Sequence, residues 1–351
     1  MSPNFTDKAW DVVIAGGGPA GFFAAIRCAE LNPHLSILIL EKASQTLGKV
    51  LISGGGRCNV THACFDPAKL VTFYPRGGNE LRGAFSRFQP KDTVEWFESR
   101  GVKLKVESDG RMFPVTNSSE TVAESLREAA KKNGVKVQLG ANLLKVEKAQ
   151  KNGFRLEVRQ EAQIFTIRTK KVLIATGSDS KTREIVQSLG HSVVEPVPSL
   201  FTFNVKDKRI DGLAGVSVED VTLKMDSVTA RGPLLITHWG MSGPAVLRCS
   251  AWGARELHEK KYRANLSVNW LGDYTFDKAL EVLTRNKEWK DNLKKKVGTT
   301  PAFSQLPLRL WKQLTEFIGE KNWADMSKAE LRQLAQELTA GEFHITGKGQ
   351  F

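Results

Sequence analysis

A glycine-rich turn near the start of the chain restricts its fold more than any other feature. The segment DVVIA at residues 11–15 is apolar after its first residue and reads as a short buried strand. An alanine-rich helix is expected over 21–31 and a second apolar strand over 35–40. The turn between the first strand and the helix contains Gly16, Gly18, Pro19, Ala20 and Gly21. This order predicts a βαβ unit in a parallel sheet covered on both faces.

The spacing G-x-G-x-x-G at Gly16, Gly18 and Gly21 is typical of a dinucleotide-binding turn. The first glycine permits the tight turn, the second lets the backbone approach a pyrophosphate, and the third lets the helix pack on the strand. The helix N-terminus offers free N–H groups to the phosphates. Glu41 ends the second strand, where an acid accepts the hydroxyls of an adenosine ribose and repels a 2′-phosphate. The pattern predicts a dinucleotide other than NADP, with an ordinary glycine turn as the alternative.

The stretch KVLISGGGRCNVT at residues 49–61 is too rich in glycine for a strand or a helix. Such a loop can bind an anion through its backbone N–H groups, and Lys49 and Arg57 can neutralise phosphate charge. A second phosphate-facing loop favours a long ligand, FAD rather than NAD; a surface loop without a ligand is the alternative. Beyond the glycine turn and Glu41, the residues expected at the cofactor are Lys42, Lys49, Ser53, Gly54, Gly55, Gly56, Arg57, Cys58, Asn59, Leu143, Thr176 and Gly177.

The composition indicates a globular protein that attracts anions. The chain has 351 residues, which predicts two or more domains, and its 51 basic and 38 acidic residues leave a formal net charge of +13. This charge favours nucleotides, nucleic acid or an acidic membrane as partners, with a solvated basic surface as the alternative. Four cysteines form no C-x-x-C pair, and no metal site is expected, because Cys58, His62 and Cys64 lack a fourth ligand. Without a signal core or a long apolar run, we expect a cytoplasmic protein that does not enter a membrane.

The pattern changes at Glu195-Pro196-Val197-Pro198, which predicts a domain boundary. We expect residues 1–195 to form an α/β domain, residues 196–274 with 340–351 a β-rich domain, and residues 275–339 a helical subdomain. In the first domain we expect helices at 90–101 and 119–133, strands at 102–106, 111–114, 135–139, 143–148, 154–160, 163–168 and 171–175, and a link at 179–190. In the rest we expect strands at 201–205, 215–218, 221–225, 266–270 and 342–346, and a helix at 244–259.

Five stretches together resemble the BaiN/RdsA-like (YhiN-like) family of NAD(P)/FAD-dependent flavoprotein oxidoreductases. They read DVVIAGGGPAG, EKASQTLGKVLISGGGRCNVTH, KVLIATGS, PVPSLFTF and GPLLITHWGMSGPAVLRCSAWGA. The resemblance implies a doubly wound Rossmann-like FAD-binding domain with an inserted β-barrel-like domain, which itself carries a small helical insertion. The chain departs from the family where Ser178 replaces a glycine after Ala175-Thr176-Gly177. Family members also continue past the returning strand, so we expect a truncated chain at Phe351 that lacks the final FAD-domain segment.

Three residues are candidates for a catalytic role: His238, Cys58 and Asn59. His238 precedes a turn of small residues and a helix start at Pro244, and it is a candidate proton donor, with a packing role as the alternative. Cys58 follows Arg57, whose charge would lower the pKa of the thiol, so Cys58 is a candidate redox partner of the flavin, with a structural role as the alternative.

A lysine-rich segment at 287–296 could bind RNA phosphates. Trp270, Trp289, Trp311 and Trp323 are near it in the sequence and would stack on bases or, alternatively, form a core.

We expect an FAD-dependent oxidoreductase in which NAD(P)H binds transiently and a small unsaturated substrate receives the hydride. One alternative is a flavoenzyme that reduces an rRNA uridine to dihydrouridine. Others are an FAD-binding sensor without turnover and an inactive truncated fragment. The oligomeric state is unknown from the sequence.

Overall fold

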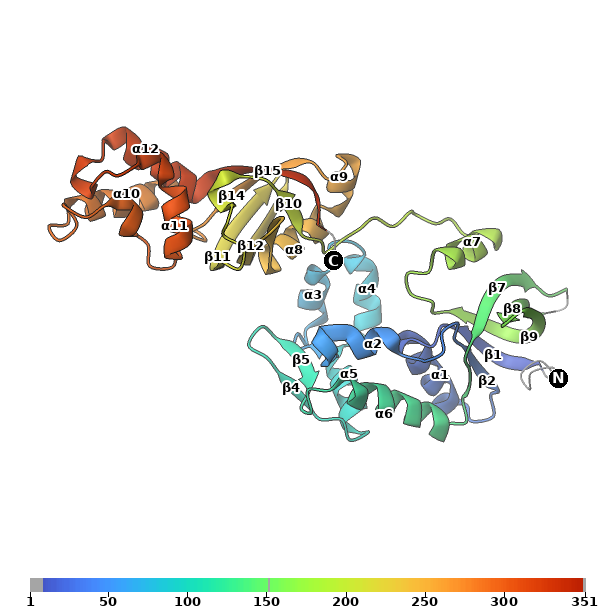
Figure 1. The fold of residues 1–351 in the computed structure, drawn as a ribbon. Coiled ribbons are helices and arrows are strands. Elements are labelled where there is room, and N and C mark those ends of the chain that lie inside the picture. Colours follow the sequence, from blue (N-terminus) through green and yellow to red (C-terminus); the bar gives the residue numbers. More distant parts are fainter. Residues whose placement is uncertain (1–8, 151, 350–351) are drawn as a thin grey trace. The chain divides into compact units, whose positions relative to one another are not determined.

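A computed structural model describes residues 9–150 and 152–349 of the chain. The chain divides between Val194 and Glu195 into two compact units (Figure 1). No hydrophobic core cluster of the described residues includes residues from both units. The two units are therefore described separately.

The first unit is built on a six-stranded sheet in the order β6-β2-β1-β9-β8-β7. Its strands are β1 (Trp10–Ala15), β2 (Ile37–Leu40), β6 (Lys136–Gln138), β7 (Ala141–Lys148), β8 (Phe154–Gln160) and β9 (Gln163–Ile174). Strand β1 pairs in parallel with β2 and β9, and β2 pairs in parallel with β6, whereas β7, β8 and β9 form an antiparallel meander. The predicted βαβ unit is confirmed, and the parallel half of the sheet carries it.

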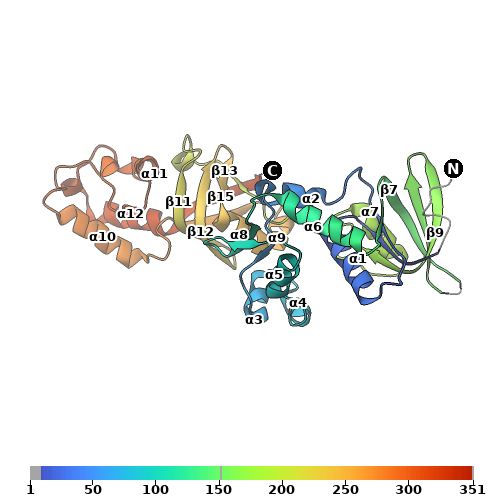
Figure 2. The same cartoon turned by 90° about the horizontal axis from the view of Figure 1, so that it is seen from below.

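Apolar side chains of β1 alternate between two cores, one on each face of the sheet. Ile14 belongs to the core beneath the helices α1 (Pro19–Leu31) and α6 (Ser119–Lys132), which pack side by side (Figure 2). Val13 belongs to the opposite core, which includes Ile185 of α7 (Ser180–Ser188). Coverage on both faces defines the doubly wound α/β arrangement that the apolar strands predict.

Three local expectations for the first unit are wrong. The loop at 49–61 contains a short helix, α2 (Gly48–Ile52), followed by a 3-10 turn, η1 (Ser53–Gly56). The strands expected at 163–168 and 171–175 are one strand, β9, whose C-terminal end is partly exposed. The link expected at 179–190 is largely helix α7.

The rest of the first unit is an excursion between β2 and α6, in which the helix expected at 90–101 and the strands expected at 102–106 and 111–114 are present. Its elements are β3 (Thr61–His62), α3 (Pro67–Leu70), η2 (Val71–Phe73), α4 (Gly78–Phe85), α5 (Pro90–Glu98), β4 (Leu104–Val106) and β5 (Arg111–Pro114). Strands β4 and β5 pair antiparallel and β3 joins them as the third strand.

The second unit is a closed barrel in the order β10-β13-β12-β11-β14-β15. Its strands are β10 (Phe203–Val205), β11 (Ser217–Met225), β12 (Val228–Thr237), β13 (Gly240–Ser242), β14 (Ala264–Asn269) and β15 (Gly341–Lys348). Antiparallel pairing of β10 with β15 closes the barrel. The predicted helix at 244–259 is present as α8 (Pro244–Trp252) and α9 (Ala254–Glu259). The barrel that the resemblance implies is confirmed.

A helical insertion between β14 and β15 completes the second unit. It contains α10 (Phe276–Glu288), η4 (Val297–Thr299), α11 (Leu308–Leu314), η5 (Glu316–Ile318), η6 (Trp323–Asp325) and α12 (Lys328–Ala340). Trp270, Trp311 and Trp323 are fully buried in the core of this unit, so they do not stack on RNA bases. Within the described residues, no helix is both long and apolar enough to cross a bilayer.

Candidate cofactor site

The first and third glycines of the G-x-G-x-x-G turn are required by the fold itself. Gly16 has a φ of 113°, and a Cβ there would overlap the carbonyl oxygen of Ala175 at the end of the sheet. A Cβ on Gly21 would overlap the carbonyl oxygen of Gly16, because helix α1 packs directly against the turn. Overlap with the chain's own backbone, and not with a ligand, therefore excludes every other residue type at both positions.

Gly18 differs, because a Cβ built there meets no atom within 4 Å. It is the N-cap of α1, and no side chain of the described residues caps this helix end. The first helical position is Pro19, which has no N–H group, and the first turn carries no acidic side chain. The helix N-terminus thus presents backbone N–H groups and the positive end of its dipole to open space, which fits a pyrophosphate.

Glu41 is held beside this turn by two backbone hydrogen bonds. Its Oε2 accepts from the N–H of Gly17 and its Oε1 accepts from the N–H of Ala43, each at 2.8 Å. Each carboxylate oxygen has two acceptor sites, so one remains on each for a ribose hydroxyl. The carboxylate is fixed next to the open helix end, in the position expected for recognition of the adenosine ribose.

A small cavity of about 60 Å³ opens at this edge of the sheet. It brings together five of the predicted cofactor residues, namely Gly16, Glu41, Lys42, Leu143 and Thr176. Two contacts close it: Lys42 Nζ donates to Asp179 Oδ2 at 2.7 Å, and the hydroxyl groups of Thr176 and Thr182 are 2.8 Å apart.

Asp179 was missed by sequence reasoning. It is the N-cap of α7, where its side chain accepts from the N–H of Lys181 at 3.2 Å. An aspartate before an apolar-periodic stretch was the available signal. Lys42 holds the pKa of this carboxyl below its usual range.

The SGGG segment adopts a left-handed backbone that only glycine takes readily. Gly54, Gly55 and Gly56 have φ values of 58°, 68° and 82°. The preceding helix α2 is anchored to α6, because Ser119 Oγ donates to the carbonyl of Leu51 at 2.7 Å. The predicted anion loop is therefore an ordered turn whose glycines are exposed.

The two basic residues predicted to neutralise phosphates are placed differently. Lys49 Nζ donates to Ser178 Oγ at 3.1 Å, which puts it next to Gly177 at the edge of the sheet. Arg57 forms an ion pair with Glu107 at 2.6 Å and stacks on Phe113 with its Cζ 4.1 Å from the ring centroid. In this structure Lys49 is therefore directed to the expected cofactor side, whereas Arg57 ties its loop to the β4–β5 hairpin.

Cys58 is buried and has a φ of 60°. Burial raises the pKa of its thiol, and a hydrogen bond with Ser53 opposes this only in part. The expectation that Arg57 lowers the pKa of this thiol is therefore wrong, because burial raises it. Asn59 is exposed. Among the described residues no group of His, Cys, Asp and Glu could hold a metal ion.

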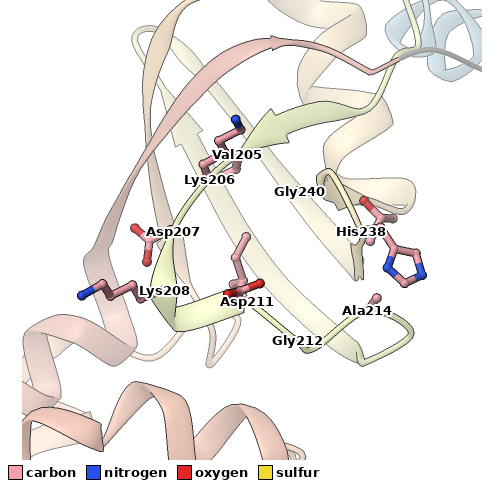
Figure 3. Close-up of a pocket in the computed structure, with 11 residues that line it drawn as sticks. Val205, Lys206, Asp207, Lys208, Asp211, Gly212, Ala214, His238 and Gly240 are labelled. Carbon is pink, nitrogen blue, oxygen red and sulfur yellow. The ribbon is translucent and has the colours of Figure 1, made fainter.

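The third catalytic candidate, His238, belongs to the second unit. It is exposed in the turn between β12 and β13, beside a cavity of about 670 Å³ at one end of the barrel (Figure 3). The cavity is also lined by Lys206, Lys208 and Asp211, so its wall is polar on several sides.

A Rossmann-type unit with an open glycine turn, followed in the chain by a unit built on an antiparallel barrel, defines the class: a Rossmann-type α/β protein with a second, barrel-forming unit. The model of the HI0933-like protein Rossmann domain family matches residues 10–302, and the chain belongs to this family. The resemblance to the BaiN/RdsA-like flavoproteins is thereby confirmed.

Several known proteins are similar to this chain. The ribosomal RNA dihydrouridine synthase of Escherichia coli (strain K12) is 27% identical over 321 residues, covering 88% of this chain and 74% of that protein. The 3-dehydro-bile acid delta(4,6)-reductase of Clostridium scindens is 27% identical over 263 residues, covering 71% and 61%. Among solved structures, the 3-ketosteroid-delta4-(5alpha)-dehydrogenase of Rhodococcus jostii RHA1 has a TM-score of 0.48 at 15% identity, covering 76% of this chain and 67% of that one.

Proposed function

We propose that this protein is an FAD-dependent reductase that takes its electrons from NAD(P)H and reduces a carbon–carbon double bond. The observation that carries the proposal is the open N-terminus of α1 at Gly18, with Glu41 fixed beside it. The sequence contains no second complete G-x-G-x-x-G, so the nicotinamide donor would bind transiently. We place this reaction in the cytoplasm.

The residues of the first unit would hold FAD at the carboxyl edge of the sheet. The first turn of α1 would bind the pyrophosphate, Glu41 would accept the ribose hydroxyls, and Lys49 would add a positive charge. Ligand pockets usually measure ~300–1,000 Å³, so the cavity of about 60 Å³ must widen before it admits an adenosine. Opening the ion pair between Lys42 and Asp179 would widen it.

Bound FAD supplies hydride transfer to and from carbon. The protein must then deliver a proton to the reduced carbon, and His238, which is exposed in the second unit, is our candidate from the sequence. Cys58 keeps its proton near neutral pH, since burial raises the pKa of the thiol. In this proposal Cys58 has a structural role in its loop and does not react as a thiolate.

Two substrate classes fit this chemistry. A small enone is favoured by the similarity to a bile acid reductase. An rRNA uridine is favoured by the similarity to an rRNA dihydrouridine synthase and by the net charge of +13. A flavin-binding sensor is a different class of function, which would hold FAD without turnover.

An anaerobic reduction experiment distinguishes these functions. The FAD-loaded protein is mixed with NADH or NADPH, and the bleached flavin is then offered deproteinised rRNA or a steroid enone. The proposal expects bleaching by a nicotinamide donor and reoxidation by one of the two substrates. Flavin that never bleaches contradicts the reductase and supports the sensor.

A further inference from the structure

The excess positive charge of the second unit is concentrated in one short stretch. Residues 195–351 contain 23 Lys and Arg and 19 Asp and Glu, and residues 285–296 alone contain six of the former and two of the latter. The remainder of the unit is balanced, with 17 of each. We call residues 285–296, at the end of α10 and the turn that follows it, the basic turn.

Some cations of the basic turn are paired and others are free. Arg285 pairs with Glu281, and Lys296 pairs with Glu320. Lys290 and Lys294 are exposed and form no ion pair or side-chain hydrogen bond with any described residue. These two ammonium groups are available to an external anion without breaking an existing ion pair.

Trp289 gives the basic turn an exposed aromatic surface. This residue is 57% exposed, whereas Trp270, Trp311 and Trp323 of the same unit are fully buried. Its indole N–H donates to Asp291 Oδ2 at 3.3 Å, which fixes the ring on the surface. An exposed ring among free lysines is the combination that binds single-stranded nucleic acid, through stacking and phosphate contacts.

The basic turn is held in shape by its neighbours. The backbone N–H groups of Trp323 and Ala324 donate to the carbonyls of Lys295 and Leu293, at 3.0 and 3.2 Å. Asn292 Nδ2 donates to Asn286 Oδ1 at 2.8 Å. Because the turn is already ordered, a ligand would not need to order it, which favours binding.

We propose that the basic turn is an RNA-docking surface, on which Lys290 and Lys294 contact phosphates and Trp289 stacks on an unpaired base. This inference rests on the rRNA candidate of the proposed function and names the surface that would receive the RNA. An anionic membrane fits less well, because Leu293 is the only other large apolar side chain exposed within the stretch, and membrane-surface segments need a continuous apolar face.

The test measures RNA binding by the FAD-loaded chain without any nicotinamide. Fluorescence anisotropy follows a labelled oligouridylate of roughly 16 nucleotides across a range of salt concentrations. The variant K290A/K294A is compared with K224A/K278A, which removes two exposed lysines of the same unit outside the basic turn. Trp289→Ala is compared with Trp289→Phe, which keeps an aromatic ring. The visible spectrum and circular dichroism of each variant report its flavin and its fold.

Loss of two phosphate contacts should lower the slope of log K against log salt by about 1.4 in K290A/K294A and leave it unchanged in K224A/K278A. Trp289→Ala should weaken binding about 5- to 150-fold at every salt concentration, and Trp289→Phe much less. If K290A/K294A and K224A/K278A gave equal slopes, the claim that the basic turn is the RNA-docking surface would be overturned. The proposed reductase function would not be affected by that result. A wild-type chain that binds phosphatidylserine vesicles but no RNA would overturn the RNA partner. A chain that binds RNA but whose flavin is not bleached by a nicotinamide donor would contradict the proposed reductase function and not the RNA-docking surface.

Discussion

Alanine at Gly18 should separate the requirements of the fold from those of the cofactor. A Cβ at Gly18 meets nothing within 4 Å, and the residue has a φ of −86°, which any residue adopts. The folded chain should therefore accept Gly18→Ala. Gly16→Ala is the matched contrast, because φ there is 113° and the added Cβ would overlap the carbonyl of Ala175.

The expected magnitudes follow from these positions. Alanine is a poorer N-cap than glycine by roughly 0.5–1 kcal/mol, and the reduced freedom of the unfolded chain offsets ~0.4–1 kcal/mol. The free energy of unfolding of Gly18→Ala should thus stay within about 1 kcal/mol of the wild type. Gly16→Ala should lose more than about 2 kcal/mol, since the left-handed backbone alone costs ~1–2 kcal/mol before the overlap.

Gly18→Ala, which should hardly change the stability of the fold, should clearly weaken the binding of FAD. The new Cβ at Gly18 occupies the space through which the backbone must approach the pyrophosphate. Losing one hydrogen bond to a charged phosphate costs about 1.5–3 kcal/mol, which raises the Kd for FAD about 10- to 150-fold.

Flavin fluorescence titration measures the Kd of each variant, and thermal unfolding of the FAD-free chains measures their stability. Gly48→Ala is a neutral control, because its Cβ also meets nothing within 4 Å. Wild-type FAD affinity in Gly18→Ala would refute the pyrophosphate placement. A loss of stability as large as that of Gly16→Ala would refute the claim that Gly18 is free of packing.

Four further outcomes are expected. Glu41→Gln should raise the Kd for FAD roughly tenfold or more in the same titration, because the ribose loses a charged acceptor; an unchanged Kd would contradict that role. Asp179→Asn keeps an N-cap for α7 but loses the ion pair with Lys42, so stopped-flow mixing should show faster FAD association; a slower rate would oppose the closing role of the pair. Lys321 and the Ser327 cap lower the pKa of Glu330 to about 2, so its stabilising contribution is present above pH ~4.3 and is lost as the pH falls toward 2; Glu330→Gln should flatten this part of the stability–pH curve, and an unchanged curve would exclude the effect. Cys58 should react with iodoacetamide at neutral pH only after unfolding, because burial raises the pKa of its thiol, and mass spectrometry of peptides checks this; rapid labelling of the folded chain would show a reactive thiolate.

The sequence alone predicts the helices and strands in which apolar residues recur with a regular period. The βαβ unit, α6 and the antiparallel hairpin of β4 and β5 follow from such patterns and are present in the structure. The sequence predicts two strands, at 163–168 and 171–175, where the structure has the single strand β9 with polar residues around Thr169. A strand that is half exposed tolerates polar residues on its outer face, so the same residues fit a continuous strand.

Contacts between distant parts of the chain could not be read from the sequence. Arg57 looked like a phosphate ligand, but it pairs with Glu107, 50 residues away, and stacks on Phe113. Lys42 and Asp179 are 137 residues apart, and only the folded sheet brings the ends of β2 and β9 to one edge. The residue types at the site were thus predictable, whereas their partners depend on tertiary packing.

The visible absorption spectrum of the purified chain tests the central claim most directly. The chain is measured as isolated, and again after incubation with FAD and removal of the unbound cofactor. Flavin bands that stay with the wild type and are lost from Gly18→Ala would bear out the cofactor site at the N-terminus of α1. A chain that retains no flavin after incubation, or that retains it equally in both forms, would contradict the account.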